Sequence, residues 1–180
     1  MRFTRRGGAI RADLAAVEAD VLTAVAGDLL ELLGEQADAD PDPLAALVGL
    51  SDGPVAAPED PALARLLPDA YGGDDEAATE FRRYTEGDLR AGKRASAGTV
   101  LATLAPLTGR GGRLVLDRDE ADAWLGCLND LRLVLGTRLD VTEETELDQR
   151  DDDPRAHALQ VYGWLGWLQE SLLSCLDPRP

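Results

Sequence analysis

The chain has 180 residues, 34 of them acidic and 18 basic, and a formal net charge of −16 at pH 7. Because phosphate backbones and anionic lipids repel a protein of that sign, the charge excludes broad binding to nucleic acid or to a membrane surface. No segment approaches the roughly 20 apolar residues of a membrane span, so we expect one domain over residues 1–180 in the cytoplasm, with no secretory signal.

The N-terminal segment is predicted to be extended. Residues 1–12 contain four arginines and no acidic residue, and the pair Gly7-Gly8 divides them into two short strands. Asp13 is expected to cap the helix that follows. Apolar residues at helical spacing continue this helix to Leu33, and Gly34 is a typical stop signal.

The next segment, residues 35–61, is acidic and rich in proline, and it is interpreted as a surface connection. A short helix is predicted around residues 62–67, before Pro68. The connection therefore separates the first long helix from the remaining helices.

A helical pattern resumes at Asp74. Thr85 followed by Asp88 resembles a capping box, which predicts a separate helix from Thr85 to about Leu104. A single bent helix across Thr85 is the alternative.

The clearest strand signal is GGRLVLD at 111–117, with the strand itself at 113–117. Asp117 or Asp119 is expected to cap the following helix, whose apolar side chains lie nearly all round it. Such a pattern is typical of a central helix.

Two further starts are predicted near the C-terminus. Thr142 is expected to begin a short acidic helix, and Asp153-Pro154 to begin the last helix, which ends near Leu176.

Two strand-to-helix segments resemble each other: GGAIRAD before a helix ending LLELLG, and GGRLVLD before one ending LRLVLG. The match is either a true repeat or a chance likeness of two amphipathic helices. If it is real, the two strands are expected to pair in one sheet. The predicted fold class is thus mainly α, with a small β element from the N-terminal segment and residues 113–117.

Few residues are suited to catalysis. His157 is the only histidine, which excludes a two-histidine metal site, and there is no glycine-rich phosphate loop. Cys127 and Cys175 lie in apolar helical patterns and are interpreted as small buried side chains. The acidic run at 143–153 lacks the spacing of a calcium loop and is interpreted as a solvated face. We predict no enzyme, metal or cofactor.

A group of arginines near the predicted helices has two interpretations. They either form ion pairs inside the protein, with Asp130, Glu80 or Asp88 as partners, or line a pocket for an anionic small molecule. The candidates are Arg82, Arg83, Arg90, Arg132 and Arg138.

The last helix contains the best candidates for an interaction surface. Trp167 points away from the predicted core face, and Gly163 and Gly166 leave a shallow groove beside it. Trp164 belongs to the same candidate surface. An exposed tryptophan is a common anchor of protein interfaces. The alternative is that the 35–61 connection covers Trp167.

The segments EFRRYTEGDLRAGKRA, LNDLRLVLGTRL and DPRAHALQVYGWLGWLQESLL resemble the domain-of-unknown-function family numbered two-zero-one-seven, found mainly in actinobacteria. The resemblance implies a cytosolic helical protein without an assigned activity. Genes of that family often lie near genes for a protease adaptor, a sulfur carrier and a metalloprotease, which points to proteolysis or cysteine metabolism. The leading hypothesis is a non-enzymatic regulator or adaptor that binds another protein or itself. The alternative is a sensor or enzyme for an anionic small molecule.

Overall fold

The computed structural model describes residues 1–34, 58–68, 75–145 and 154–177. Its elements in chain order are β1 (Thr4–Arg6), β2 (Ala9–Leu14), α1 (Ala16–Leu33), α3 (Pro61–Leu66), α4 (Asp75–Leu104), β3 (Gly112–Leu116), α5 (Arg118–Arg138) and α6 (Ala156–Leu176). The prediction of a mainly helical fold with a small β element is confirmed. The predicted connection lies mostly outside the described residues.

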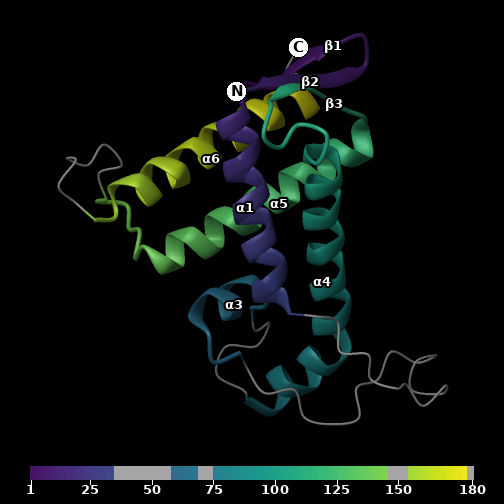
Figure 1. The fold of residues 1–180 in the computed structure, drawn as a ribbon. Helices are drawn as coiled ribbons and strands as arrows, with labels where there is room; N and C mark the ends of the chain where they lie inside the picture. The colour runs from purple at the N-terminus through teal and green to yellow at the C-terminus, as the bar shows by residue number, and fades with distance from the viewer. Residues whose placement is uncertain (35–57, 69–74, 146–153, 178–180) are drawn as a thin grey trace.

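The three strands form one antiparallel sheet in the order β1-β2-β3 at one end of the molecule (Figure 1). Gly7 and Gly8 both have positive φ angles, 59° and 85°, which match the twist of a tight hairpin turn. In the β2–β3 register, Ile10 lies opposite Leu116 and both side chains are buried. The two strands of the resembling segments therefore pair, as expected if the segments are related.

The start of α1 differs from its prediction. Asp13 does not cap the helix, because β2 continues through Leu14 to complete its pairing with β3. The helix begins at Ala16 instead, and the side chain of Glu18 accepts a hydrogen bond of 2.8 Å from the backbone N–H of Ala15. Tertiary pairing here extends the strand past a residue that favours a helix cap.

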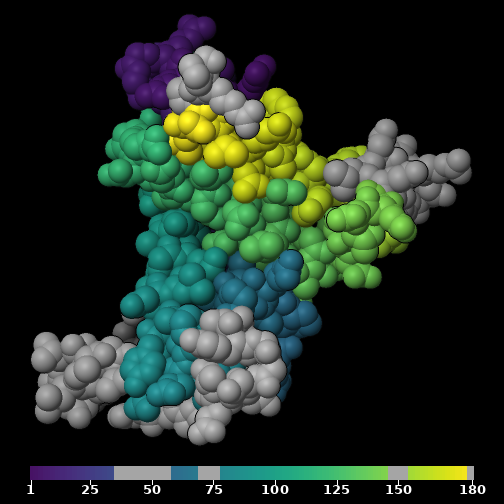
Figure 2. All heavy atoms as spheres, turned by 180° about the vertical axis from the view of Figure 1, so that it is seen from behind, coloured from purple at the N-terminus to yellow at the C-terminus, as the bar shows by residue number. Residues whose placement is uncertain are grey.

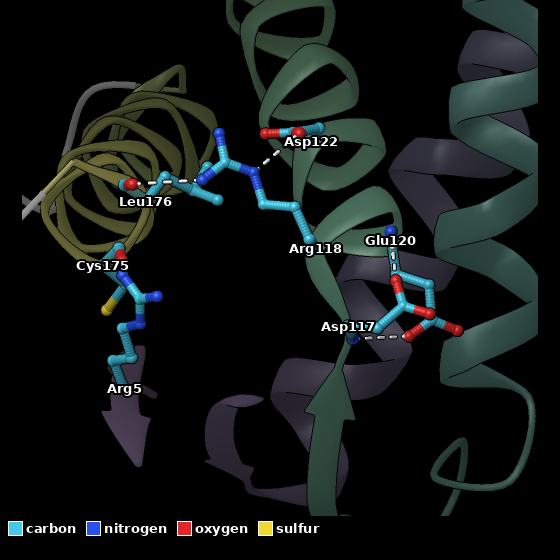
Figure 3. A network of polar contacts seen from close by, with 7 residues as sticks. All are labelled: Arg5, Asp117, Arg118, Glu120, Asp122, Cys175 and Leu176. Carbon is cyan, nitrogen blue, oxygen red and sulfur yellow. Dashed lines mark hydrogen bonds and ion pairs between the residues drawn. The ribbon is translucent and has the colours of Figure 1, made fainter. Parts of the chain in front are cut away.

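The starts of α3 and α5 follow the sequence closely. Asp60 accepts hydrogen bonds from the first backbone N–H groups of α3. Asp117 caps α5 by accepting from the N–H of Glu120, whose carboxylate accepts in turn from the N–H of Asp117 (Figure 3). Of the two proposed caps for α5, Asp117 is therefore the correct one.

The predicted break at Thr85 is wrong, and the alternative of one continuous helix is correct. The Thr85 hydroxyl donates back to the carbonyl of Phe81 at 2.9 Å instead of capping a new helix. A hydroxyl bonded in this way is compatible with a helix interior and tends to bend it. In Figure 1 the first turns of α4 diverge from the axis of the remainder.

The predicted starts near the C-terminus are also displaced. Thr142–Thr145 form a turn rather than the start of a helix, and the rest of the acidic run, residues 146–153, lies outside the described residues. α6 begins at Ala156 after a turn, so Pro154 is not at its first position.

The prediction of a central helix at residues 117–138 is confirmed, because α5 packs against α4, α6 and α3. Its Trp124 is fully buried, donates a hydrogen bond of 2.9 Å to the Thr103 hydroxyl and meets the ring of Phe3 edge-on at 5.7 Å.

Figure 2 shows the N-terminal strands beside α6 at one end, with α3 and the start of α4 toward the other. Among the described residues, none of the helices has the length and apolar character of a membrane span.

Candidate functional site

The two tryptophans of α6 lie in different surroundings. Trp167 is 45% exposed, in agreement with the first of its two interpretations, whereas Trp164 is half-buried. Trp164 lines an open groove between α1 and α6, together with Val17 and His157. The two tryptophans therefore do not form one surface patch.

Gly166, next to Trp167, does not leave a free groove. A Cβ atom on Gly166 would come within 3.3 Å of the Nε atom of Arg132, so this glycine accommodates the arginine from α5. Gly163 is half-buried on the same helix. We find that the space left by Gly166 is filled from within the protein.

Arg90 belongs to a structural contact between helices. Its guanidinium donates to the carbonyl of Leu33 at 2.6 Å and pairs with Glu86 at 2.7 Å. Arg94, one turn along α4, donates to the carbonyls of Leu30 and Gly34. Cations at a helix C-terminus satisfy its unpaired carbonyls and its negative dipole end, so these two arginines stabilise the end of α1.

Arg132 and Arg138 contact other parts of the protein. Arg132 donates to the side-chain oxygen of Gln169 at 2.8 Å and lies 5.2 Å from the ring centre of Tyr162, both on α6. Arg138 pairs with Asp60 at 2.5 Å, at the start of α3, and this hydrogen bond lowers the pKa of Asp60. Both arginines therefore hold α5 to its neighbours.

The remaining predicted residues are on or beside α4. Arg82 is buried and Arg83 half-buried, and both interact with other groups of the protein. The buried Asp130 pairs with Lys93 at 2.6 Å rather than with an arginine. Arg90, Arg132 and Arg138 thus contact α1, α6 and α3 respectively, and the structure does not bring these three together.

A different set of arginines surrounds Trp167. A hollow of about 690 Å³ lies over the outer face of the sheet beside α6, and we call it the arginine hollow. Its lining comprises Met1, Arg2, Thr4, Arg6, Arg11, Ala12, Asp13, Arg113 and Trp167.

The strand register explains this gathering. Thr4 lies opposite Arg11, and Asp13 lies opposite Arg113, so these side chains share the solvent face of the sheet. The alternate residues of β2 point into the core.

The arginine hollow has a local excess of positive charge. Four guanidinium groups face one carboxylate, that of Asp13, which pairs with Arg113 at 3.0 Å. Within the part of the chain that the structure describes, neither Arg6 nor Arg11 forms an ion pair, and both are exposed. The hollow is thus able to pair with further anionic groups.

Two neighbouring arginines, one from β1 and one from α5, contact the end of α6. Arg5 points to the other side of β1 and donates to the carbonyl of Cys175 at 3.4 Å (Figure 3). Arg118 donates to the carbonyl of Leu176 at 3.2 Å and pairs with Asp122. The two arginines satisfy carbonyls at the end of α6 and so fix β1 and α5 beside that helix.

The cysteines are confirmed as buried side chains. Burial, together with the negative charge of Asp130, raises the pKa of the Cys127 thiol to about 12. Burial also raises the pKa of Cys175, with Arg2 and Arg5 acting in the opposite direction. The thiolate is the reactive form of cysteine, and a low pKa is needed to populate it near neutral pH. Neither cysteine has such a low pKa.

Of the residues that line the arginine hollow, the sequence singles out Trp167 but none of the arginines. The signal was present, because residues 1–12 contain four arginines without an acidic residue. The sequence does not show the strand register that brings Arg113, about a hundred residues away, to the same face.

The family model described as a domain of unknown function, DUF2017, matches residues 1–176. The chain belongs to this family. The oxidative stress regulator AosR of Mycobacterium tuberculosis (strain H37Rv) is 35% identical over 187 residues, which cover 96% of this chain and 84% of the relative. The putative oxidative stress regulator AosR of Mycobacterium leprae is 35% identical, with 96% and 85% covered. No solved structure matches the chain.

Proposed function

We propose that this protein is a non-enzymatic regulator of the response to oxidative stress, and that it acts by binding another protein at the arginine hollow and Trp167. The relatives of the family that are named oxidative stress regulators support the biological role. The observation that carries the binding role is the exposed tryptophan beside arginines that have free hydrogen-bonding capacity.

The residue types of this surface favour protein binding. Tryptophan and arginine are enriched among the residues that contribute most to interfaces, because they combine a large contact area with directed polar groups. Partner binding would remove part of the 45% exposed Trp167 side chain from water. The rigid arginine fork can also hold a carboxylate through two hydrogen bonds.

The cysteine environments bear on how such a regulator would respond to oxidants. The raised pKa values of Cys127 and Cys175 disfavour direct oxidation of a thiolate in the folded protein. We infer that the link to oxidants runs through the bound partner rather than through these cysteines. The connection with proteolysis or cysteine metabolism stays a prediction.

The alternative function, a sensor or enzyme for an anionic small molecule, would need arginines that are free to bind a ligand. Arg90, Arg132 and Arg138 are each bonded to a different helix. An anion site between them would require these contacts to break.

Complementation of a deletion strain tests the proposal. The gene is deleted in its own bacterium, and survival after hydrogen peroxide is measured with the wild-type protein, with Trp167→Ala or with Leu173→Ala. Leu173 is a matched control, because it is exposed on the same helix but does not line the arginine hollow. We expect wild type and Leu173→Ala to restore survival and Trp167→Ala to fail at equal protein levels.

Two results would contradict the proposal separately. Unchanged peroxide survival of the deletion strain would show that the role in oxidative stress is wrong. Full complementation by Trp167→Ala would show that the binding surface lies elsewhere.

A further inference from the structure

We propose that the arginine hollow binds a short acidic segment of the partner protein, with an aromatic or aliphatic side chain of that segment against Trp167. This inference rests on the proposed function and specifies the chemistry of its partner.

Charge complementarity is the first argument. Arg2, Arg6 and Arg11 face the hollow, while the carboxylate of Asp13 is paired with Arg113. The positive charge is local, because the whole chain has a net charge of −16. Carboxylates of a partner would gain charge-assisted hydrogen bonds at this place and be repelled over much of the remaining surface.

The apolar surface beside the arginines is the second argument. Trp167 lines the hollow and is 45% exposed. Val115 does not line the hollow, but it lies opposite Arg11 in the sheet register and is 50% exposed. Exposed apolar residues favour an apolar side chain in the ligand, because contact between them removes the surfaces of both the ligand and the protein from water. A segment with carboxylates alone would leave this surface uncovered.

Size and total charge disfavour an extended anionic partner and a second copy of this chain. The volume of about 690 Å³ lies in the range of about 300–1,000 Å³ that is typical of ligand sites, so the hollow fits a few side chains. Nucleic acid and anionic membranes extend far beyond such a hollow and would meet the acidic remainder of the protein. A second copy of the chain has the same charge of −16 and is disfavoured by long-range repulsion.

Peptide binding by the full chain tests the inference. The probe is a fluorescently labelled peptide with glutamates on both sides of a phenylalanine, and binding is followed by anisotropy at low and high salt. One control peptide has lysine for each glutamate, and another has serine for phenylalanine. We expect the glutamate–phenylalanine peptide to bind at least about tenfold more tightly than the serine peptide, and the lysine peptide not to bind. Binding should weaken at high salt.

Variants locate the binding site. Arg11→Glu and Trp167→Ala should each weaken binding of the glutamate–phenylalanine peptide by about tenfold. The matched controls are Arg65→Glu, which makes the same charge change at an exposed residue of α3, and Leu173→Ala on α6. Both controls should bind as wild type does, and melting temperatures check that all variants are folded.

Several outcomes would overturn the inference. The first is an equal loss of peptide affinity in Arg11→Glu and Arg65→Glu. The second is tighter binding of inorganic phosphate, ATP or a single-stranded oligonucleotide than of the peptide. The third is a dimer in light scattering that Arg11→Glu dissociates. The proposed function is tested apart from this, because peroxide survival does not depend on the probe. If the peptide does not bind but Trp167→Ala still fails to complement, the acidic segment is rejected as the ligand, whereas the proposed binding surface is retained.

Discussion

The buried thiol of Cys127 is predicted to be almost inert toward oxidants and alkylating reagents in the folded protein. Its side chain is 1% exposed, and its pKa is raised from 9.0 to about 12, first by burial and then by the charge of Asp130. A rise of about three pKa units lowers the thiolate fraction near neutral pH about a thousandfold. The rate of reaction should fall by at least a comparable factor, because access is also blocked.

Iodoacetamide labelling at pH 7.5, followed by peptide mass spectrometry, measures this difference. In the folded protein, Cys127 should be labelled at least about a thousandfold more slowly than in urea. Cys175, which is 8% exposed, should react before Cys127. Labelling of native Cys127 within a few-fold of its rate in urea would refute the reasoning, and would reopen a direct sensing role.

Three further predictions concern stability. Between about pH 9 and 12 the unfolded Cys127 thiol ionises while the folded one stays protonated, so the free energy of unfolding should fall by up to about 1.4 kcal/mol per pH unit. Lys93→Met should lower the unfolding free energy by about 3 kcal/mol, because it leaves the buried carboxylate of Asp130 without its cation. Gly111→Ala should lower it by about 3 kcal/mol or more, since φ is +68° and the new Cβ would lie 2.5 Å from the carbonyl oxygen of Leu14.

Urea unfolding at several pH values checks all three, each with its own control. Cys127→Ala should have a shallower alkaline slope than wild type, and equal slopes would contradict the linkage. Lys93→Met/Asp130→Leu should recover most of the loss, whereas a double variant as unstable as the single one would reject an unpaired charge as the cause. Gly109→Ala, at φ +77° with nothing within 4 Å, should lose only about 1 kcal/mol.

The sequence determined the parts of this protein that depend on neighbouring residues. The glycine pair predicted the hairpin turn, Asp117 the start of α5, and the apolar periodicity the long helices, because turns, caps and amphipathic faces arise within a few residues of the chain. It also indicated the family and the burial of both cysteines, and it gave exposure as one of two interpretations of Trp167.

Only the tertiary structure decided how distant segments combine. Asp13 has the chemistry of a helix cap, but pairing with β3 holds it in a strand opposite Arg113. Thr85 has the chemistry of a cap as well, yet its hydroxyl bonds within one continuous helix. The physical reason is that a strand register or a helix contact is set by packing across the molecule, which local propensity does not encode.

The same distinction applies to the candidate site. Composition showed that arginines gather in an acidic chain, but it did not show which of them are bonded internally. Arg90 and Arg132 meet carbonyl or side-chain acceptors on other helices, whereas Arg6 and Arg11 face solvent beside Trp167. The sheet register and the packing of β1 on α6 made that difference, because together they place side chains from both ends of the chain around one hollow.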